Sequence, residues 1–240
     1  MQMTKELEKR LKLMQRFNQV LGDKRSMYTR AKLYNDKIFV HNNVMYATDG
    51  NIFVAASNLT DQKDFSFFKC SSKKFEYLDS SNKEVKEDKE ATGDGKTFEK
   101  LLQPFEKLLQ PFEKLLQPLN CASVSFDIDF EGYPLPVKLC SSWSSRHRDT
   151  LTVNFQTEEA VIDFCGGLEA VGGVTGTYGD IIKNISGTVP ENPIHFAFWH
   201  IMEIMKQCKV KKIHIESYPD VHRNTCKVGD YTFVFTHCAK

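Results

Sequence analysis

The sequence predicts an α+β protein with many short strands and few helices. Three observations support this class. The chain begins with an amphipathic helix pattern. Short β-rich segments separated by turn residues follow it. Strand and helix patterns then occur together without regular alternation, which argues against a doubly wound parallel sheet.

Residues 4–21 carry the clearest helix pattern. Thr4 suits the N-cap, and Gly22 suits the position after the last turn. At ~100° per residue, one side of the helix is apolar, with Phe17 at its edge. The apolar residues are Leu7, Leu11, Met14 and Leu21. We expect this side to pack against the rest of the protein.

The opposite side of the helix carries a row of cations within an arc of ~60°. This basic ridge consists of Lys5, Lys9, Lys12 and Arg16. Its spacing suits contact with successive phosphates of a duplex, and no side-chain set accompanies it to read bases. The alternative interpretation is an ordinary solvated helix face. Both interpretations also apply to the smaller basic groups at 146–148 and 209–212.

The rest of the first half is predicted to form short strands, one polar loop and a repeat. The strand patterns are AKLY, KIFVH, VMYA, NIFVAA and DFSFFKC. Residues 80–96 are charged and poor in apolar side chains, so we expect an exposed loop. FEKLLQP then occurs three times in tandem over 98–118. Its prolines favour a kinked series of one-turn helices, and a local expansion without function is the alternative.

Strand patterns resume in the second half with SVSFDIDF, PVKLC and TLTVNF. Thr157 suits the N-cap of a helix, EEAVIDFCGG, which ends in a glycine pair. A glycine-rich loop, VGGVTGTYG, and a short segment, DIIKNI, follow. The last elements are predicted to be strand IHFAF, helix WHIMEIMKQC, and strands KKIHIES and YTFVFTH.

Composition narrows the function classes. The formal net charge is +1, so a nucleic acid must be bound through a local patch. The start of the chain lacks a long apolar stretch, and later apolar runs are shorter than a membrane span. We therefore expect no export signal and no membrane segment. Seven scattered cysteines without a C-x-x-C pair indicate free thiols in a reducing compartment, the cytoplasm.

No arrangement of residues predicts a catalytic centre. The glycine-rich loop lacks the G-x-G-x-x-G register and a following lysine, so a flexible turn is the simpler interpretation. The histidines and cysteines between 208 and 238 lack a paired anchor for a metal. Cys165 would lie at a helix C-terminus, where the dipole disfavours a thiolate. We predict no enzyme activity, cofactor or metal, with a hydrolase using Cys165, His147 or His222 as an alternative.

Residues 31–56 resemble a known family. VMYATDGNIFVA, at 44–55, is similar to the ATDG hairpin of the bacterial replication sliding clamp, the DNA polymerase III beta subunit. In that family a helix precedes a strand with Arg-x-x-Leu, a second strand and this hairpin. Here the helix is followed by Arg30-Ala-Lys-Leu33, KIFVH and the hairpin. The end of the chain, IHFAFWHIMEIMKQCKVKKIHIES and GDYTFVFTH, resembles the family's closing elements.

The resemblance implies a DNA-clamp-like α+β fold of short antiparallel strands with helices on one face. It implies two similar units, 1–120 and 121–240, with the charged loop and the repeat in the first. Because clamp helices line a central hole, the basic ridge would face duplex phosphates. A two-unit chain would oligomerise to close a ring, as similar two-domain clamps do by forming trimers. Bacterial or phage origin would suit the resemblance.

The family also binds short peptides of polymerases and other partners in an apolar pocket. The matching positions are Thr48, Gly50, Asn51, Ile52, Phe53, Phe235 and His237. The sequence departs from the family here, since Asn51-Ile52-Phe53 replaces the usual His-Arg-Leu and FTHCAK replaces Met-Pro-Met-Arg. Filling of a hairpin core by Ile52 and Phe53 is the alternative.

We therefore predict a sliding-clamp-like processivity factor that contacts duplex DNA without sequence specificity and recruits replication proteins. The alternative is a clamp-fold scaffold or regulatory protein that does not encircle DNA.

Overall fold

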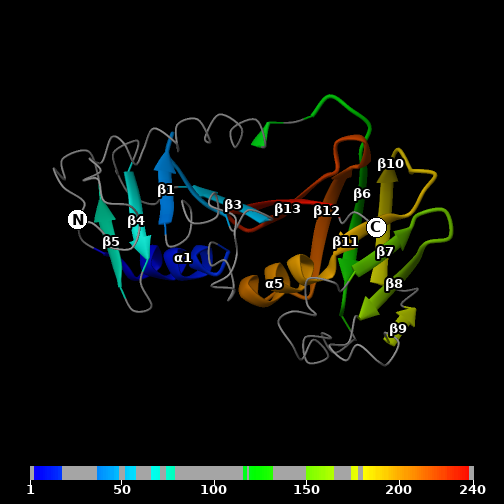
Figure 1. The fold of residues 1–240 in the computed structure, drawn as a ribbon, viewed down its shortest axis with the longest axis horizontal. Helices are drawn as coiled ribbons and strands as arrows, with labels where there is room; N and C mark the ends of the chain where they lie inside the picture. Colours follow the sequence, from blue (N-terminus) through cyan, green and yellow to red (C-terminus); the bar gives the residue numbers. More distant parts are fainter. Residues whose placement is uncertain are drawn as a thin grey trace, which may run out of the picture. The chain divides into compact units, whose positions relative to one another are not determined.

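The computed structural model describes residues 3–17, 37–48, 52–57, 66–70, 74–78, 116–117, 119–131, 150–164, 174–177 and 181–237. The chain divides into two compact units, 1–119 (unit 1) and 120–240 (unit 2). The described residues are mostly antiparallel strands with two α-helices (Figure 1), which confirms the expected α+β class.

The described residues of unit 1 include the helix α1 and one antiparallel sheet. Its elements are α1 (Lys5–Gln15), β1 (Lys37–His41), β2 (Val44–Thr48), β3 (Ile52–Ser57), β4 (Ser66–Cys70) and β5 (Phe75–Leu78). The strands pair in the order β3-β2-β1-β4-β5. Asn42 and Asn43, with φ of 48° and 59°, form the two-residue turn between β1 and β2. Asparagine tolerates this left-handed backbone, which matches the twist of a tight hairpin.

The apolar side of α1 packs against β1 and β2. Leu7, Leu11 and Met14 have no exposed surface, and Phe17 is 1% exposed. The helical spacing of these residues therefore predicted the buried side correctly.

The described residues of unit 2 form two antiparallel sheets and the helix α5. Its elements are β6 (Val124–Asp129), β7 (Thr150–Asn154), β8 (Glu159–Phe164), β9 (Val174–Thr177), β10 (Ile182–Gly187), β11 (Ile194–Ala197), α5 (Phe198–Cys208), β12 (Lys212–Tyr218), the 3-10 turn η3 (Pro219–Val221), β13 (Arg223–Val228) and β14 (Tyr231–Thr236). One sheet has the order β10-β6-β12-β13-β14 and the other β11-β7-β8-β9.

Aromatic side chains join the two sheets of unit 2. Phe126 on β6 is fully buried, and its ring centroid lies 5.0 Å from that of Phe155 and 5.7 Å from that of Phe196. Phe155 follows β7, and Phe196 belongs to β11. Alternation along β6 sends Val124, Phe126 and Ile128 into this core, so the opposite face of the strand is left to Asp127 and Asp129.

The first helix is shorter than predicted. Its last helical residue is Gln15, and the backbone N–H groups of Arg16 and Phe17 donate to Leu13 and Met14, three residues back. This tightened last turn places Phe17 in the core and ends the α-helix. Leu21 and Gly22 lie outside the described residues.

The prediction of a helix after Thr157 is wrong, because residues 159–164 form the strand β8. The side-chain oxygen of Asn154 accepts hydrogen bonds from the backbone N–H groups of Gln156 and Thr157, and Glu158 has a φ of 56°. These features make a turn that leads β7 back into β8. Ala160 and Ile162 are buried two residues apart, and this period of two wins over the local helical pattern.

The prediction of a glycine-rich loop is also partly wrong, because residues 174–177 form β9, which pairs with β8. Three further strands had not been predicted, β5, β10 and β13. β13 lacks an apolar alternation, and it is held between β12 and β14 with the polar Asn224 fully buried. The strands predicted as AKLY and PVKLC, the loop at 80–96 and nearly all of the FEKLLQP repeat lie outside the described residues.

Candidate nucleic-acid interface

The sequence of α1 positions the basic ridge toward solvent. The hydroxyl of Thr4 accepts a hydrogen bond from the backbone N–H of Leu7 at 3.2 Å, so the predicted N-cap is confirmed. Glu6 and Glu8 in the first turn stabilise the helix, because their negative charges lie near the positive end of the helix dipole. All four ridge residues, Lys5, Lys9, Lys12 and Arg16, are exposed. The packing of α1 therefore leaves a row of cations accessible to a partner.

Little within the described part of the chain neutralises the ridge. Lys12 pairs with Glu8 at 2.5 Å, but both side chains are largely exposed, at 64% and 44%. An exposed pair of this kind contributes only about 0.3–0.5 kcal/mol, so a phosphate can displace Glu8. Lys5, Lys9 and Arg16 form no ion pair with any described residue. The ridge thus keeps its positive charge.

A fifth cation of α1, Arg10, is buried rather than presented to solvent. It is only 4% exposed, and its Nη1 donates hydrogen bonds to the carbonyl and to the hydroxyl of Ser57, at the end of β3. Arg10 lies ~60° or less from the apolar side by the helical period, which is the signal that could have identified it. This charged contact ties α1 to the sheet and fixes which side of the helix faces outward.

The predicted peptide-binding residues of unit 1 lie at the β2–β3 hairpin. The hydroxyl of Thr48 donates to the carbonyl of Ile52 at 2.8 Å, which closes the hairpin. Ile52 and Phe53 are 1% and 4% exposed, and the Phe53 ring stacks on Tyr46 with centroids 5.6 Å apart. Both apolar side chains therefore contribute to the core. Gly50 and Asn51 lie outside the described residues, and a peptide site here stays a prediction.

The two predicted residues of unit 2 lie at the end of β14. Phe235 is 1% exposed. His237, two residues further along the chain, is half-buried, and its ring lies in a polar network. Nε2 of His237 lies 2.9 Å from Oδ1 of Asn224 and 3.0 Å from Oγ of Ser217. Both partners are fully buried. A peptide-binding role for Phe235 and His237 also stays a prediction.

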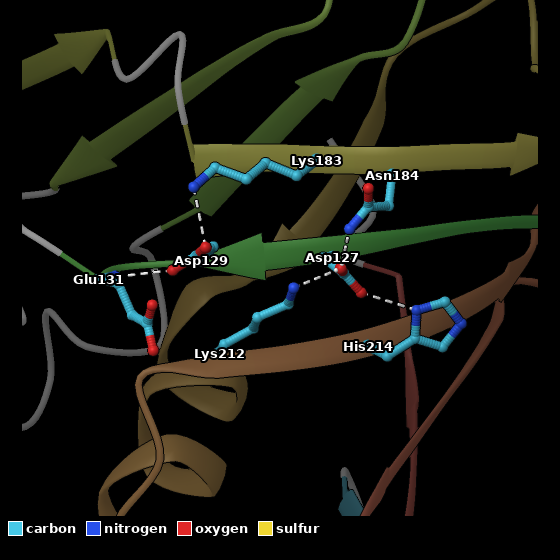
Figure 2. Close-up of polar contacts among 7 residues, drawn as sticks. All are labelled: Asp127, Asp129, Glu131, Lys183, Asn184, Lys212 and His214. Carbon is cyan, nitrogen blue, oxygen red and sulfur yellow. Dashed lines mark hydrogen bonds and ion pairs between the residues drawn. The ribbon is translucent and has the colours of Figure 1, made fainter.

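A second polar cluster lies on the outer face of β10, β6 and β12 (Figure 2). Asp127 accepts from Asn184 at 2.6 Å, pairs with Lys212 at 2.9 Å, and contacts Nδ1 of His214 at 2.8 Å. Asp129 pairs with Lys183 at 2.8 Å. A register shift in β10 between Lys183 and Ser186, with Asn184 at φ 54°, lets the consecutive Lys183 and Asn184 both reach β6.

The partners of the two aspartates stabilise their charged forms. Burial alone would raise the pKa of Asp127, but hydrogen bonds from Asn184, Lys212 and His214 outweigh it and lower the pKa to about 2. The hydrogen bond from Lys183, followed by the backbone N–H of Glu131, lowers the pKa of Asp129. Two lysines thus balance two carboxylates, so this cluster gives no net attraction for phosphate. It contrasts in that respect with the ridge.

Asp127→Asn is expected to reduce the loss of stability of unit 2 in acid. Because the folded pKa of Asp127 lies below the ordinary value of 3.8, its stabilisation is complete above that value. It disappears as the pH falls toward about 2. At neutral pH the substitution should cost about 1–2 kcal/mol, after allowance for solvent screening. Urea unfolding at neutral pH and in acid measures this difference, and an unchanged pH dependence would contradict it.

Ser217 and His237, which are in contact among the described residues of unit 2, do not form an activated nucleophile–base pair. The Asn224 amide nitrogen donates to the carbonyl of Phe235, so Oδ1 faces His237 and Nε2 of His237 must carry a proton. A protonated nitrogen cannot take the proton of Ser217, which is the step that activates a serine nucleophile. Cys165 lies outside the described residues, and the helix that would have held it is replaced by β8.

Metal binding and membrane insertion find no supporting feature in the described stretches. No three His, Cys, Asp or Glu side chains among those residues gather as metal ligands. Burial raises the pKa of Cys208 to about 11 and that of Cys226 to about 12, so both stay thiols near neutral pH. Neither α1 nor α5 has the length and apolar character needed to cross a bilayer.

Comparison with known proteins identifies the fold. No protein-family model and no curated protein matches the sequence. Solved sliding clamps match the structure. The Helicobacter pylori beta clamp bound to a DNA ligase peptide has 12% identity and a TM-score of 0.53, covering 98% of this chain and 65% of that one. The Bartonella birtlesii sliding clamp bound to griselimycin has 11% identity and a TM-score of 0.54, covering 98% of this chain and 64% of that one. The Bacillus subtilis sliding clamp has 10% identity and a TM-score of 0.52, covering 97% of this chain and 63% of that one.

The protein therefore has the fold of a bacterial DNA polymerase sliding clamp, and the predicted clamp-like fold is confirmed. At this level of identity the likeness concerns the fold alone. The chain also spans less than two thirds of the length of the clamps that it matches, 62% in the case of the Borrelia burgdorferi beta subunit.

Proposed function

We propose that this protein is a sliding-clamp-like, DNA-binding processivity factor that contacts duplex phosphates through the basic ridge. The single observation that carries the proposal is the exposed row of Lys5, Lys9, Lys12 and Arg16 on a chain with the clamp fold. The ridge and the fold were recognised by independent signals, helical periodicity in one case and backbone similarity in the other. Their agreement favours DNA over an unspecific solvated face.

Phosphate contacts of this kind suit a protein that must hold DNA and still move along it. Lysine and arginine side chains on a helix surface meet successive phosphates, which carry no sequence information. Each contact is weak and interchangeable, so the protein can slide without crossing a large barrier. The net charge of +1 makes the attraction local. Association should therefore depend steeply on salt although the whole chain is nearly neutral.

Partner recruitment through short peptides completes the proposal. Similar clamps have been solved with a DNA ligase peptide and with griselimycin bound, which supports peptide partners for this chain. The proposed contact residues are Thr48, Gly50, Asn51, Ile52, Phe53, Phe235 and His237. We further propose two clamp-like units, 1–120 and 121–240, a homo-oligomer that closes a ring, a cytoplasmic location and no enzymatic activity. A bacterial or phage origin fits these properties.

A closed ring should remain on circular DNA and leave linear DNA through its ends. We expect the protein to coelute with a nicked circular duplex at low salt. It should be lost when a restriction enzyme linearises the same DNA, because topology and not affinity retains it. Size-exclusion chromatography with light scattering should give a mass above that of one 27.6 kDa chain. Equal retention on both DNA forms would contradict encirclement, and a monomeric mass would contradict the oligomer.

A clamp-fold scaffold that does not encircle DNA is the second candidate function. The near-neutral charge of the chain favours this function. So does the burial of Ile52 and Phe53, because these two residues, at which the hairpin departs from the family motif, fill the core of their own unit. A scaffold of this type would bind protein partners without a steep salt dependence on DNA. The DNA retention experiment separates the two, because only the processivity factor discriminates circles from linear molecules.

A further inference from the structure

The end of β14 is one place where the two sheets of unit 2 are in contact. His237, the last described residue, forms an isolated antiparallel bridge with Phe196 of β11. Its backbone N–H also donates to the carbonyl of His222, at the turn before β13, at 3.2 Å. β11 belongs to one sheet and β13 to the other. A single residue thus connects both sheets near the C-terminus.

The His237 side chain reinforces this connection. Nε2 reaches over β13 to Asn224 at 2.9 Å and to Ser217 of β12 at 3.0 Å. The ring also packs edge-on against Phe196 and His222, with centroids 5.7 Å and 5.6 Å away. Because Nε2 already carries the proton that faces Asn224, a second proton must go to Nδ1 and make the ring a cation.

The surroundings of the ring oppose such a cation. Burial, followed by His222 and then His195, lowers the pKa of His237 to about 4. β12 and β13 contribute the neutral Ser217 and Asn224, and the titratable groups that act on the ring from the η3 turn and β11 are both histidines. His195 itself contacts the hydroxyl of Thr152 at 2.9 Å. Desolvation and these two neighbouring histidines thus all disfavour the charged form of the His237 ring.

We propose that His237 is an acid-sensitive latch, whose neutral ring holds the end of β14 at the junction of the two sheets and whose protonation releases it. The folded pKa lies below the ordinary value of 6.5, so the latch is closed above that value. It weakens as the pH falls from about 6.5 toward about 4. The latch is independent of DNA binding, because it resides wholly in unit 2 and uses none of the ridge residues.

Hydrogen exchange at the His237 amide tests the latch directly. Between about pH 7.5 and about pH 5, we expect its protection to fall about ten-fold after correction for the intrinsic exchange rate. The amide of Cys226, inside the same sheet on β13, is the internal reference and should keep its protection. His237→Gln keeps a hydrogen-bond donor but cannot titrate, so its protection should not change with pH. The matched control is His214→Gln, on the exposed face of β12, which should retain the ten-fold fall.

Each outcome decides the proposal. Constant protection of the wild-type His237 amide over this pH range overturns it, and so does a ten-fold fall in His237→Gln. If His237→Gln does not fold, an NMR titration of the wild-type imidazoles replaces it. A His237 ring that titrates well below the ordinary value of 6.5, together with loss of its amide protection over the same pH interval, supports the latch. A His237 ring that titrates at the ordinary value overturns it.

Discussion

Replacing Lys5, Lys9, Lys12 and Arg16 together with alanine is expected to abolish most of the affinity for duplex DNA at low salt. Each phosphate contact contributes ~0.9 to the slope of log K against log salt concentration, so the loss of four contacts should reduce the magnitude of this slope by about 3.6. The wild-type protein should therefore lose about a hundred-fold more affinity than the variant between ~50 and ~200 mM salt. Alanine favours the helix, and the four side chains are exposed, so the fold should persist. Fluorescence anisotropy with a labelled duplex measures the slope.

A matched variant removes the same charge from a different place. Lys206, Lys209, Lys211 and Lys227 are exposed cations of unit 2 that form no ion pair with any described residue. Their replacement by alanine lowers the net charge by four as well. We expect it to change the salt slope much less than the ridge variant does. Equal slopes for the two variants would mean that overall charge, or the basic group at 209–212, contributes as much as the ridge to DNA binding. An unchanged slope in the ridge variant would contradict the interface.

Phe126→Ala is expected to destabilise unit 2 by about 3–5 kcal/mol. The ring of Phe126, on β6 of one sheet, is fully buried against Phe155, which follows β7, and Phe196 of β11, both on the other sheet. Truncation therefore leaves a cavity where the two sheets meet. Both tryptophans of the chain, Trp143 and Trp199, fall within 120–240. Tryptophan fluorescence during urea unfolding therefore reports on unit 2, and the midpoint should shift strongly to lower urea.

Phe126→Leu is the matched control for this change. Leucine keeps most of the apolar volume, so the cost should stay below about 1.5 kcal/mol. Leu11→Ala, in the fully buried side of α1, should destabilise unit 1 without a comparable shift in the tryptophan signal. A small effect of Phe126→Ala would show that the sheets do not depend on this aromatic contact.

Features that depend on local spacing could be predicted from the sequence. The N-cap at Thr4 and the buried side with Leu7 and Leu11 follow from helical periodicity, which acts within one element. The ridge follows from the same period. Strands with an apolar alternation and a turn between them, such as KIFVH and VMYA, were also found. In these segments the local preference and the tertiary environment agree.

Features that depend on a neighbouring strand could not be predicted. Residues 159–164 carry a helical pattern and a strand pattern at once, and pairing with β7 and β9 selects the strand. Nothing in the local sequence of β6 indicates partners for its acidic residues. Only the register of β10 and β12 shows that Asp127 meets Asn184, Lys212 and His214. The burial of Arg10 depends likewise on Ser57, 47 residues away in the chain.

The sequence by itself determined the α+β class, the side of the first helix that is buried and the row of exposed cations on which the proposed DNA contact rests. Each of these depends on side chains a few residues apart, whose relative positions the backbone geometry of a single helix or strand fixes. The tertiary structure alone decided the pairing of β13, the neutral polar cluster on β6 and the junction at His237. Those contacts join residues far apart in sequence, and their formation depends on the packing of whole sheets, which local propensity does not contain.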